Sequence, residues 1–596
     1  MAVNNNGHGS QPVYVLGISG KYNQGGSGGD AHHPAAALLR DGEIVAMTGE
    51  ERFVRVKNAI GQFPYHAIKF CLDTAGITAE RLDAIAWSND PFLANERWIK
   101  VNNTTVKRMA YGLTSRLNRS KNGVKKGLRL FDLMLKPWEE EANQKAGFRD
   151  KLRLDVDKIP FYRVDHHFSH AASAYYASGF KEATVITWDG SGDGLSATIS
   201  HGKDGKLKTL EERLDFSIGE LYWTIHKFMK LSDEGSLMGL AGYGKPQNFF
   251  KGLVDADRLF MDLNQISRPA GTSETWVGYH PSLVARLGQP RLPDEPLEDR
   301  HRDIAADLQK LVEDFGFAFL RRALEMTGCR NVAFAGGVAL NAVMNGKIAR
   351  SGLVDNIFIQ PEAGDSGGAL GAAYMGYQRL GHDLQPKALE HAYWGAGFTD
   401  EEIEQALAIT KVRYQKVTRD ELVEIVASEL ADKKMVGWFQ GRAEWGPRAL
   451  GARSILADAR FREMNLKVNA AVKYRDDWRP FAPSMIEEVA SEYMEGAMYA
   501  PFMIMTFPVK EEKKQVIPAV VHVDGTTRPQ TVRRSVNPLY YDMIKRLGEK
   551  TGVPVVMNTS FNLKGEPVVN SPRDALRTFF SSGLDVLALG NFIIRK

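Results

Sequence analysis

The segment that decides the fold class is Ala183-Thr184-Val185-Ile186-Thr187-Trp188-Asp189-Gly190-Ser191-Gly192-Asp193-Gly194-Leu195-Ser196-Ala197-Thr198-Ile199. Its pattern predicts an apolar strand, a turn of glycine and polar residues, and a returning strand. An earlier unit has the same plan: a strand from Val13 to Ile18, glycines, and a β-hairpin that turns at Asp41-Gly42. The repetition predicts an internally duplicated α/β domain.

The chain is too long for one hydrophobic core. It has 596 residues, of which 43% are hydrophobic and 25% charged, whereas single cores stop growing at about 250–300 residues. We therefore expect two domains of an ordinary globular protein. A net charge of +4 argues against nucleic-acid binding by the molecule as a whole. No run of about 18 apolar residues occurs, so we expect no membrane span.

The first residues and the cysteines indicate the cellular location of the protein, and a linker-like stretch indicates its domain boundary. Residues 1–11 are polar and lack the apolar run of a signal peptide, so we interpret them as a disordered tail. Cys71 and Cys329 are the only cysteines, which excludes a disulfide framework and predicts a cytoplasmic location. Near Lys387 to Asp400 the sequence becomes linker-like and contains Gly395 and Gly397. This change predicts a first domain over residues 12–390, with an insertion at about 90–157, and a second over residues 391–596.

A basic stretch lies inside the predicted insertion. From Lys100 to Arg129 there are nine Lys or Arg residues and no Asp or Glu. One interpretation is a solvated insertion between elements of the domain. The other is a surface for an anionic acceptor, a partner or a membrane face.

Two histidines and two aspartates predict a metal site. His166 and His170 would lie on one face of a helix and could chelate a cation, although a purely structural role is the alternative for such a pair. Asp189 and Asp365 each follow an apolar strand in a glycine-rich turn. Two imidazoles and two carboxylates with open positions are typical of a metal site that also holds a nucleotide phosphate.

Two glycine-rich turns predict a nucleotide site. Gly190, Ser191, Gly192 and Asp193 form a turn whose backbone N–H groups are unobstructed, as a phosphate loop requires. Gly336 and Gly337 stand between a strand and a helix that begins at about Leu340, where the helix dipole favours phosphate; Asn341 belongs to the same motif. Most such turns are only turns, and neither matches a Walker A loop. Two of them on paired strand–turn–strand units favour an actin-like, sugar-kinase-like ATPase fold.

The strongest motif is Gly441-Arg442-Ala443-Glu444-Trp445-Gly446-Pro447-Arg448-Ala449-Leu450-Gly451-Ala452-Arg453-Ser454. Its arginines occur among Gly, Pro and Ala rather than on a solvated helix face. Converging guanidinium groups in an apolar frame suit a polyanion such as a triphosphate. Surface ion pairs are the alternative, against which Trp445 and Phe481 argue. The predicted anion-binding residues are Arg442, Arg448, Arg453, Lys473, Arg475 and Arg479.

These motifs together resemble the O-carbamoyltransferase family that includes nodulation protein U, cephalosporin carbamoyltransferase and tobramycin carbamoyltransferase. The resemblance covers nearly the whole chain. Besides the motifs above, it rests on Ala31-His32-His33-Pro34-Ala35-Ala36-Ala37, Glu50-Glu51-Arg52-Phe53, Met238-Gly239-Leu240-Ala241, His522-Val523-Asp524-Gly525, Arg528-Pro529-Gln530 and Asn558-Thr559-Ser560-Phe561-Asn562.

The resemblance implies an α/β and α+β protein of two domains. The first would be a TsaD-like, actin-like (ASKHA) domain with a bound metal, and the second a YrdC-like adenylate-forming domain. It implies that His166, His170, Asp189 and Asp365 hold iron, and that His522, Arg528, Ser560 and Asn562 complete the pocket for carbamoyl phosphate and ATP. His32 is the expected general base, because imidazole titrates near neutral pH. The family reads His-Asp where this chain has His32-His33, so His33 stays an alternative.

The activity that the resemblance implies is ATP-dependent O-carbamoylation. Carbamoyl phosphate, ATP and Mg²⁺ would yield a carbamoyl adenylate, whose carbamoyl group passes to a hydroxyl of a small acceptor in natural-product or antibiotic biosynthesis. We expect no nucleic acid as a partner, and a homodimer is our guess for the oligomeric state. Two alternatives stay open: a tRNA threonylcarbamoyl-type transferase, and a nucleotide-binding regulator of the actin-like group.

Overall fold

The computed structural model describes residues 11–22, 33–101, 121–262, 266, 279–473 and 478–596. Two five-stranded sheets in it consist of β1 (Tyr14–Ser19), β2 (Ala35–Arg40), β3 (Glu43–Gly49), β4 (Ala84–Trp87) and β5 (Phe161–Arg163), and of β6 (Glu182–Gly192), β7 (Leu195–Lys203), β8 (Lys206–Arg213), β11 (Asn331–Ala335) and β12 (Asn356–Ile359). The spatial orders are β3-β2-β1-β4-β5 and, read in the same direction, β8-β7-β6-β11-β12. The two sheets therefore have the same strand order. In each sheet an antiparallel meander is extended by two parallel strands. The predicted duplication is confirmed.

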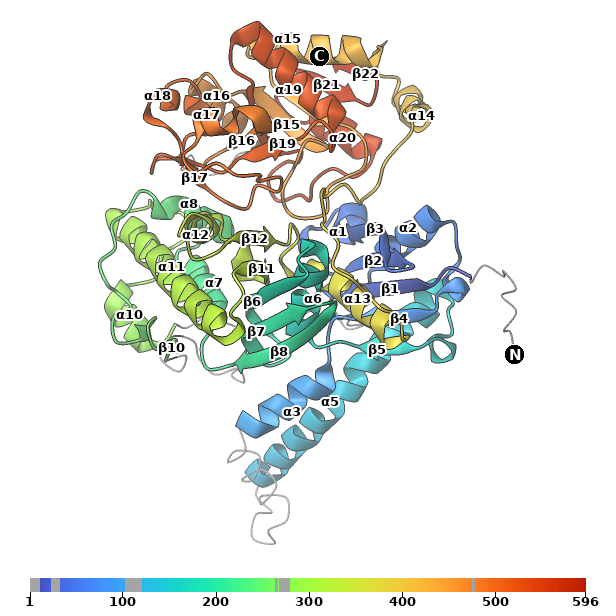
Figure 1. Cartoon of the computed structure of the whole chain (residues 1–596), viewed down its shortest axis with the longest axis vertical. Coiled ribbons are helices and arrows are strands. Elements are labelled where there is room, and N and C mark those ends of the chain that lie inside the picture. Colours follow the sequence, from blue (N-terminus) through green and yellow to red (C-terminus); the bar gives the residue numbers. More distant parts are fainter. Residues whose placement is uncertain (1–10, 23–32, 102–120, 263–265, 267–278, 474–477) are drawn as a thin grey trace, which may run out of the picture.

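Two helices fill the space between these sheets (Figure 1). Helix α13 (Gly368–Arg379) packs on β1, helix α6 (His166–Ser178) packs on β6 and β11, and the two helices pack on each other. A Cβ atom on Gly371 would lie 1.7 Å from the carbonyl oxygen of Ser169, so only glycine permits this approach. Every residue of α6 except Phe168 is buried. The predicted helix that carries His166 and His170 therefore exists and lies inside the protein.

A third sheet of eight strands forms the upper body in Figure 1. Its order is β13-β22-β21-β14-β15-β20-β16-β19. The strands are β13 (Gln415–Lys416), β14 (Val436–Phe439), β15 (Arg453–Asp458), β16 (Ala482–Ile486), β19 (Gln530–Val532), β20 (Val555–Ser560), β21 (Val586–Leu589) and β22 (Phe592–Arg595). Helices α15 (Arg419–Ala431) and α19 (Pro538–Thr551) pack on each other beside this sheet. The C-terminal part is thus α/β, as expected.

Further helices and short strands complete the two parts. The long helix α11 (Asp299–Thr327) ends at Gly328, which has a left-handed conformation. The other described elements are α1 (Glu51–Val54), α2 (Tyr65–Ala75), α7 (Ile218–Phe228), α8 (Glu234–Ala241), β9 (Val254–Asp255), β10 (Phe260–Met261), α10 (Pro281–Leu287), α12 (Ala342–Ala349), α14 (Asp400–Thr410), α16 (Glu463–Val468), α17 (Ala490–Tyr493), β17 (Phe507–Pro508), α18 (Glu511–Lys514), β18 (Thr526–Thr527) and α20 (Pro572–Phe580).

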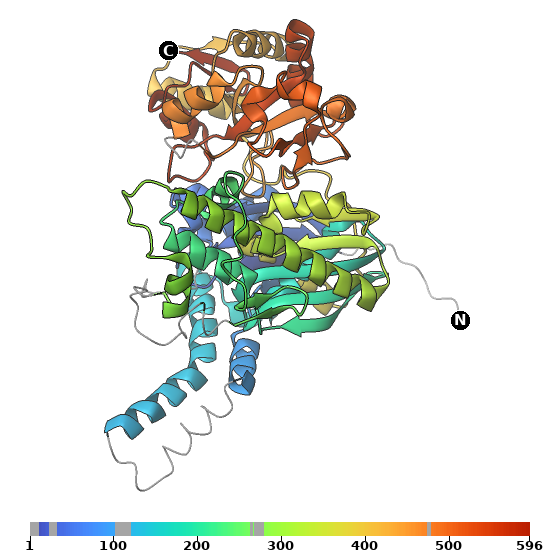
Figure 2. The ribbon, with the colours of Figure 1, turned by 90° about the vertical axis from the view of Figure 1, so that its left-hand side faces the viewer.

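The predicted insertion contains a helical hairpin. Helices α3 (Pro91–Val101) and α5 (Lys121–Leu152) project away from the sheets (Figures 1 and 2). At the base of the hairpin, Arg97 pairs with Asp165 at 2.5 Å and with Glu212 at 2.6 Å. Part of the basic stretch falls on residues 102–120, outside the described residues, so both interpretations of it stay predictions. Over the described ranges, no helix combines the length and apolar character needed to cross a membrane.

Candidate functional site

One cavity of about 2590 Å³ lies between the duplicated sheets and the eight-stranded sheet. Residues before Lys387 form one wall, among them Asp189 and Asp365, and residues after Asp400 form the other, among them Arg448 and Lys473. The predicted metal site and the predicted anion site therefore border the same space.

The four predicted metal ligands lie together. One side-chain donor atom from each of His166, His170, Asp189 and Asp365 lies within 4.8 Å of the other three. Asp189 Oδ2 is 3.2 Å from His166 Nε2 and 3.3 Å from His170 Nε2, and the two Nε2 atoms are 3.1 Å apart. The carboxylates line the cavity, with the buried histidines behind them. This donor set fits a divalent cation, and imidazole ligands suit iron or zinc better than magnesium.

Local structure holds the histidines in place. Asp165 caps α6 by accepting a hydrogen bond from the backbone N–H of Phe168 at 2.7 Å. The carboxylate of Asp193 accepts a hydrogen bond from the backbone N–H of His166 at 2.9 Å. A Cβ atom on Gly192 would lie 2.0 Å from the ring of His166, so the end of β6 can pack against the imidazole only with glycine at this position.

The histidines and aspartates of this cluster shift one another's pKa values. Burial opposes the protonation of His166, but the hydrogen bond to Asp189 and the charge of Asp365 outweigh it and raise the pKa of His166 to about 9. Burial and the charge of Asp365 disfavour ionisation of Asp189, yet the hydrogen bonds from His166 and His170 lower its pKa to about 2. Both effects show a site built to hold positive charge between two carboxylates, which a cation can supply.

His33 and Glu362 stand at the edge of this cluster and line the cavity. His33 Nδ1 is 3.6 Å from Asp365 Oδ2. Burial opposes protonation of His33, but the hydrogen bond and charge of Asp365 raise its pKa to about 9. Burial raises the pKa of Glu362 to about 7 against the opposing charge of His33. His32, the expected base, lies outside the described residues, so the choice between His32 and His33 stays open.

The two glycine-rich turns contribute unequally to the cavity. Gly190, Ser191, Gly337 and Asn341 line it. Gly192, Asp193 and Gly336 lie behind the lining: the carboxylate of Asp193 accepts backbone N–H groups, and Gly336 packs against the backbone of Trp188. The side chain of Asn341 caps α12 through the N–H of Met344 at 3.0 Å. Only the first four residues can touch a ligand in the cavity.

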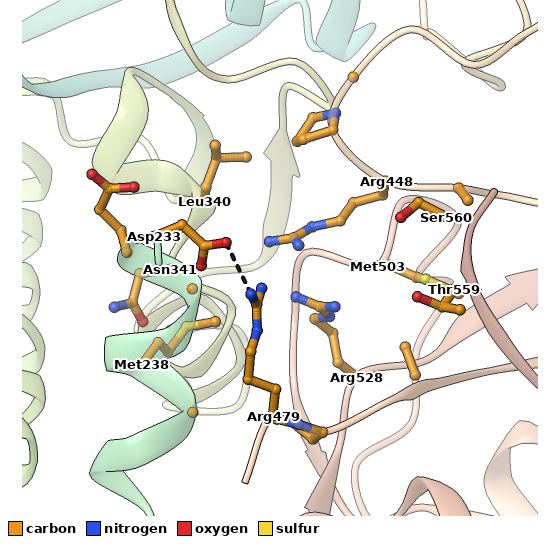
Figure 3. A pocket seen from close by; sticks show the side chains of 18 of the residues that line it. Asp233, Met238, Leu340, Asn341, Arg448, Arg479, Met503, Arg528, Thr559 and Ser560 are labelled. Carbon is orange, nitrogen blue, oxygen red and sulfur yellow. Dashed lines mark hydrogen bonds and ion pairs between the residues drawn. The ribbon is translucent and has the colours of Figure 1, made fainter. Parts of the chain in front are cut away.

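Three arginines converge on the other wall (Figure 3). Within the described part of the chain, the guanidinium of Arg448 makes no hydrogen bond or ion pair, and its Nε is buried without a partner. Burial and the charge of Arg479 lower the pKa of Arg448 to about 10. Arg479 Nη1 pairs with Asp233 Oδ2 at 2.9 Å, and Arg528 lines the same space. An unpaired, half-buried guanidinium beside two further cations creates a strong preference for an anion.

A lysine and two polar residues continue this wall. Lys473 Nζ donates to Ser560 Oγ at 3.1 Å and to Asn562 Oδ1 at 2.6 Å, besides their carbonyl oxygens. His522 also lines the cavity, and burial lowers its pKa to about 4, so it is neutral near pH 7. The predicted residues Lys473, His522, Ser560 and Asn562 are thus brought together with the three arginines.

Two predicted anion-binding arginines do not line the cavity. Arg442 donates to the backbone oxygens of Gly395, Trp394 and Val45. Arg453 is completely buried, stacks on Phe439 at 3.6 Å, and donates to the carbonyl oxygens of Gln440, Ala452, Ala396 and Gly441. Both guanidinium groups are occupied by the backbone, which gives them a structural role in this arrangement. Arg475 lies outside the described residues.

Some cavity residues received no role from the sequence. Arg52 and Asp233 line the cavity and contact its far wall, and Glu362 lines it beside His33. Arg52 belongs to the motif Glu50-Glu51-Arg52-Phe53, which was a usable signal. Asp233 and Glu362 lie outside the charged motifs, and only the folded chain brings them to the site.

Comparisons with known proteins cover both halves. The family model described as the carbamoyltransferase N-terminus matches residues 26–374, and that of the carbamoyltransferase C-terminus matches residues 427–596. The nodulation protein NolNO of Sinorhizobium fredii is 36% identical over 579 residues, which are 95% of this chain and 79% of that protein. The nodulation protein NolO of Bradyrhizobium diazoefficiens is 39% identical over 446 residues, 73% of this chain and 79% of that protein.

Solved structures are more distant. Component A of the (R)-2-hydroxyglutaryl-CoA dehydratase of Acidaminococcus fermentans covers 62% of this chain and 100% of its own, at 14% identity and a TM-score of 0.33. A full-length HypF structure in its phosphate- and nucleotide-bound form covers 63% of this chain and 56% of its own, at 14% identity and a TM-score of 0.30. Similarities at this level carry no conclusion about this chain.

Proposed function

This chain belongs to the carbamoyltransferase family, and from that premise we propose that it uses ATP and carbamoyl phosphate to carbamoylate a hydroxyl of a small acceptor. The family resemblance inferred from the motifs is confirmed, and so is the expectation of a carbamoyltransferase enzyme. The donor, the acceptor and the intermediate belong to the proposal.

The observation that carries the proposal is the unpaired guanidinium of Arg448 in a cavity that also borders the His/Asp cluster. An anion bound by Arg448, Arg479 and Arg528 and a nucleotide phosphate near Asp189 and Asp365 would occupy one continuous space. A carbamoyl group is a poor electrophile, so it needs a better leaving group before an alcohol can attack it. Two anion-binding walls around one cavity suit a reaction with an activation step and a transfer step.

In the activation step, the arginine wall binds carbamoyl phosphate and the phosphates of ATP. Carbamoyl phosphate is cleaved by water to carbamate and phosphate; a carbamate oxygen then attacks the α-phosphorus of ATP, and pyrophosphate leaves. Arg448, Arg528 and Lys473 stabilise the charge that develops on the phosphate oxygens, which is usually the largest catalytic contribution. Ser560 and Asn562 orient Lys473.

In the transfer step, the acceptor hydroxyl attacks the carbamoyl carbon, and AMP leaves. A cation held by His166, His170, Asp189 and Asp365 would neutralise the nucleotide phosphate. Gly190, Ser191 and Gly337 give the phosphate room at the backbone. His32 removes the hydroxyl proton, a role typically worth about 10²–10⁴-fold. His33 is the alternative, and it would first have to release the proton that Asp365 stabilises on it. Separate His32→Asn and His33→Asn variants, assayed with a bound acceptor, decide between them.

Several finer assignments stay proposals. They are iron in the His/Asp cluster, Mg²⁺ with ATP, a TsaD-like first domain over residues 12–390, a YrdC-like second domain over residues 391–596, a cytoplasmic location, a homodimer, and a role in natural-product or antibiotic biosynthesis. A tRNA threonylcarbamoyl transferase and a nucleotide-binding regulator are the alternatives that the comparisons do not favour, because the family models match carbamoyltransferases over both halves.

The decisive experiment incubates the purified protein with carbamoyl phosphate and α-labelled ATP and follows pyrophosphate and AMP-containing products. Pyrophosphate release that requires carbamoyl phosphate is the expected result, and Arg448→Met should abolish it. Release that is independent of carbamoyl phosphate, or no release with any acceptor of a hydroxylated panel, would contradict the proposal. A tRNA-binding assay tests the first alternative directly.

A further inference from the structure

An ion pair joins the two walls of the cavity at the arginine cluster. Asp233 belongs to the segment before α8, and its Oδ2 is 2.9 Å from Nη1 of Arg479 on the opposite wall (Figure 3). The other carboxylate oxygen, Oδ1, accepts the backbone N–H of Ser236 at 2.9 Å and thereby caps α8. One carboxylate thus holds both the first turn of a helix and a cation of the predicted anion site.

Helix α8 approaches the opposite wall through glycine. Gly235, Gly239 and Gly242 are spaced four and three residues apart, which places them on one face. A Cβ atom on Gly239 would lie 3.3 Å from Cδ of Pro480, and one on Gly242 would lie 2.8 Å from Cγ1 of Val523. Asp233 is therefore fixed against the arginine wall by the packing of α8 as well as by charge.

The charge of Asp233 reaches two of the three arginines. Burial opposes its ionisation, but Arg479 and the N–H of Ser236 lower its pKa, so the carboxylate is charged. Its charge also favours the protonated form of Arg448, against the effects of burial and of Arg479. The carboxylate offsets part of the positive charge that the anion site presents, and it comes from the wall that carries the metal cluster.

We propose that Asp233 is a positioning residue for the anion site, acting through Arg479: it holds that guanidinium against α8 and competes with an incoming phosphate for it. The inference rests on the proposed function, since it assigns the arginine wall to a phosphate. Binding of the anion draws Arg479 away from Asp233 and loosens α8 from the opposite wall. Anion binding at the arginine wall therefore changes the packing of α8, which belongs to the opposite wall.

Inorganic phosphate binding to the full-length protein, measured by isothermal titration calorimetry, tests the proposal. Asp233→Asn removes the charge but keeps a good helix cap. We expect it to bind phosphate about fivefold more tightly, the size of one partly exposed ion pair. Asp233→Glu should bind nearly as the wild type does. In an Arg479→Gln background, Asp233→Asn should tighten phosphate binding clearly less than fivefold, because the main effect acts through Arg479 and only the weaker effect of the Asp233 charge on Arg448 remains.

Asp574→Asn is the matched control. Asp574 pairs with Arg55 across the same two parts of the chain at 3.4 Å but does not line the cavity. Its loss should leave the phosphate dissociation constant unchanged. An unchanged or weaker affinity in Asp233→Asn, or equal tightening in Asp574→Asn, would overturn the inference while leaving the proposed function intact. If the wild type binds no phosphate, the anion site itself is wrong. Should Asp233→Asn not fold, Asp233→Ser serves as the neutral capping variant.

Discussion

Arg52 of α1 donates a hydrogen bond of 2.8 Å from Nη2 to the carbonyl oxygen of Gly446, 394 residues later in the chain. Gly446 has a φ of 116°, and a Cβ atom there would lie 2.7 Å from the carbonyl oxygen of Pro361. The loop that presents Arg448 is therefore pressed against the loop that leads to Asp365. This contact fixes the distance between the predicted anion site and the predicted metal site.

Replacing Arg52 should destabilise this junction. Arg52→Met leaves the carbonyl oxygen of Gly446 without its donor, and we expect the free energy of unfolding to fall by about 1–3 kcal/mol. Urea denaturation followed by circular dichroism measures the loss. Arg40→Met is the control, because that side chain is 58% exposed; equal effects of the two substitutions would contradict the assigned role of Arg52.

Arg448 and Arg453 should respond in opposite ways to the same substitution. Arg448→Met removes an unpaired, half-buried charge, so stability should be unchanged or higher while phosphate binding is lost. Arg453→Met leaves several buried carbonyl oxygens without a donor, so unfolding should become easier by about 3 kcal/mol or more. Thermal unfolding and phosphate titration on both variants check this. A destabilised Arg448→Met variant that still binds phosphate would reverse the two assignments.

Removal of a predicted metal ligand should empty the cluster. His170→Ala takes away one imidazole of the four-ligand set, and we expect the bound metal to fall from about one ion per chain to near zero. Elemental analysis of the purified protein gives the content and the identity of the metal. His201→Ala is the matched control, since His201 pairs with Glu182 outside the cluster. Full metal content in His170→Ala would contradict the site.

Lys473 should matter for activation more than for folding. Lys473→Met removes a cation next to Ser560 and Asn562, and we expect carbamoyl-phosphate-dependent pyrophosphate release to fall about 10²–10³-fold, as for other lost electrostatic donors. Lys467→Met on α16 is the control, because its Nζ bonds the carbonyl oxygen of Lys433 at the surface. Activity of Lys473→Met within a few fold of the wild type would remove Lys473 from the site.

Glu362 should make stability depend on pH. Its pKa in the folded protein, about 7, lies above the ordinary value of 4.5. The folded state therefore holds a proton that the unfolded state has lost, and stability decreases as the pH rises from 4.5 through 7. Glu362→Gln lacks this effect, so the free energy of unfolding of the variant, relative to that of the wild type, should increase between pH 5 and pH 8. Unfolding free energies at the two pH values measure it; a constant difference would refute it.

The fold and the His/Asp cluster could be predicted because local patterns determine them. His166 and His170 share a helix face by spacing alone, and β6 has the same place in its sheet as β1 has in the other. Parallel strands β6 and β11 then bring the turns after them to one edge of their sheet, as such strands must. The topology of the parallel strands thus brings residues that are far apart in the sequence to the same edge of the sheet.

The anion site could be predicted only in part, because composition does not tell where a guanidinium points. Arg453 begins β15 and faces Phe439, so its donors meet backbone carbonyl oxygens, whereas Arg448 precedes the strand and faces the cavity. Asp233 escaped prediction because Arg479 lies 246 residues away. Such pairs are set by how the two parts pack, which no local pattern reports.

The cavity shared by the two walls has a consequence for concentration. One molecule confined in about 2590 Å³ is present at an effective concentration on the order of 1 M. In the proposed reaction, a product released at Arg448 would meet the wall with Asp189 and Asp365 at a concentration that free solution rarely reaches. For a short-lived species, reaction at the second wall then competes well with escape into bulk solution. The smaller the cavity, the higher the local concentration and the larger the fraction that reacts.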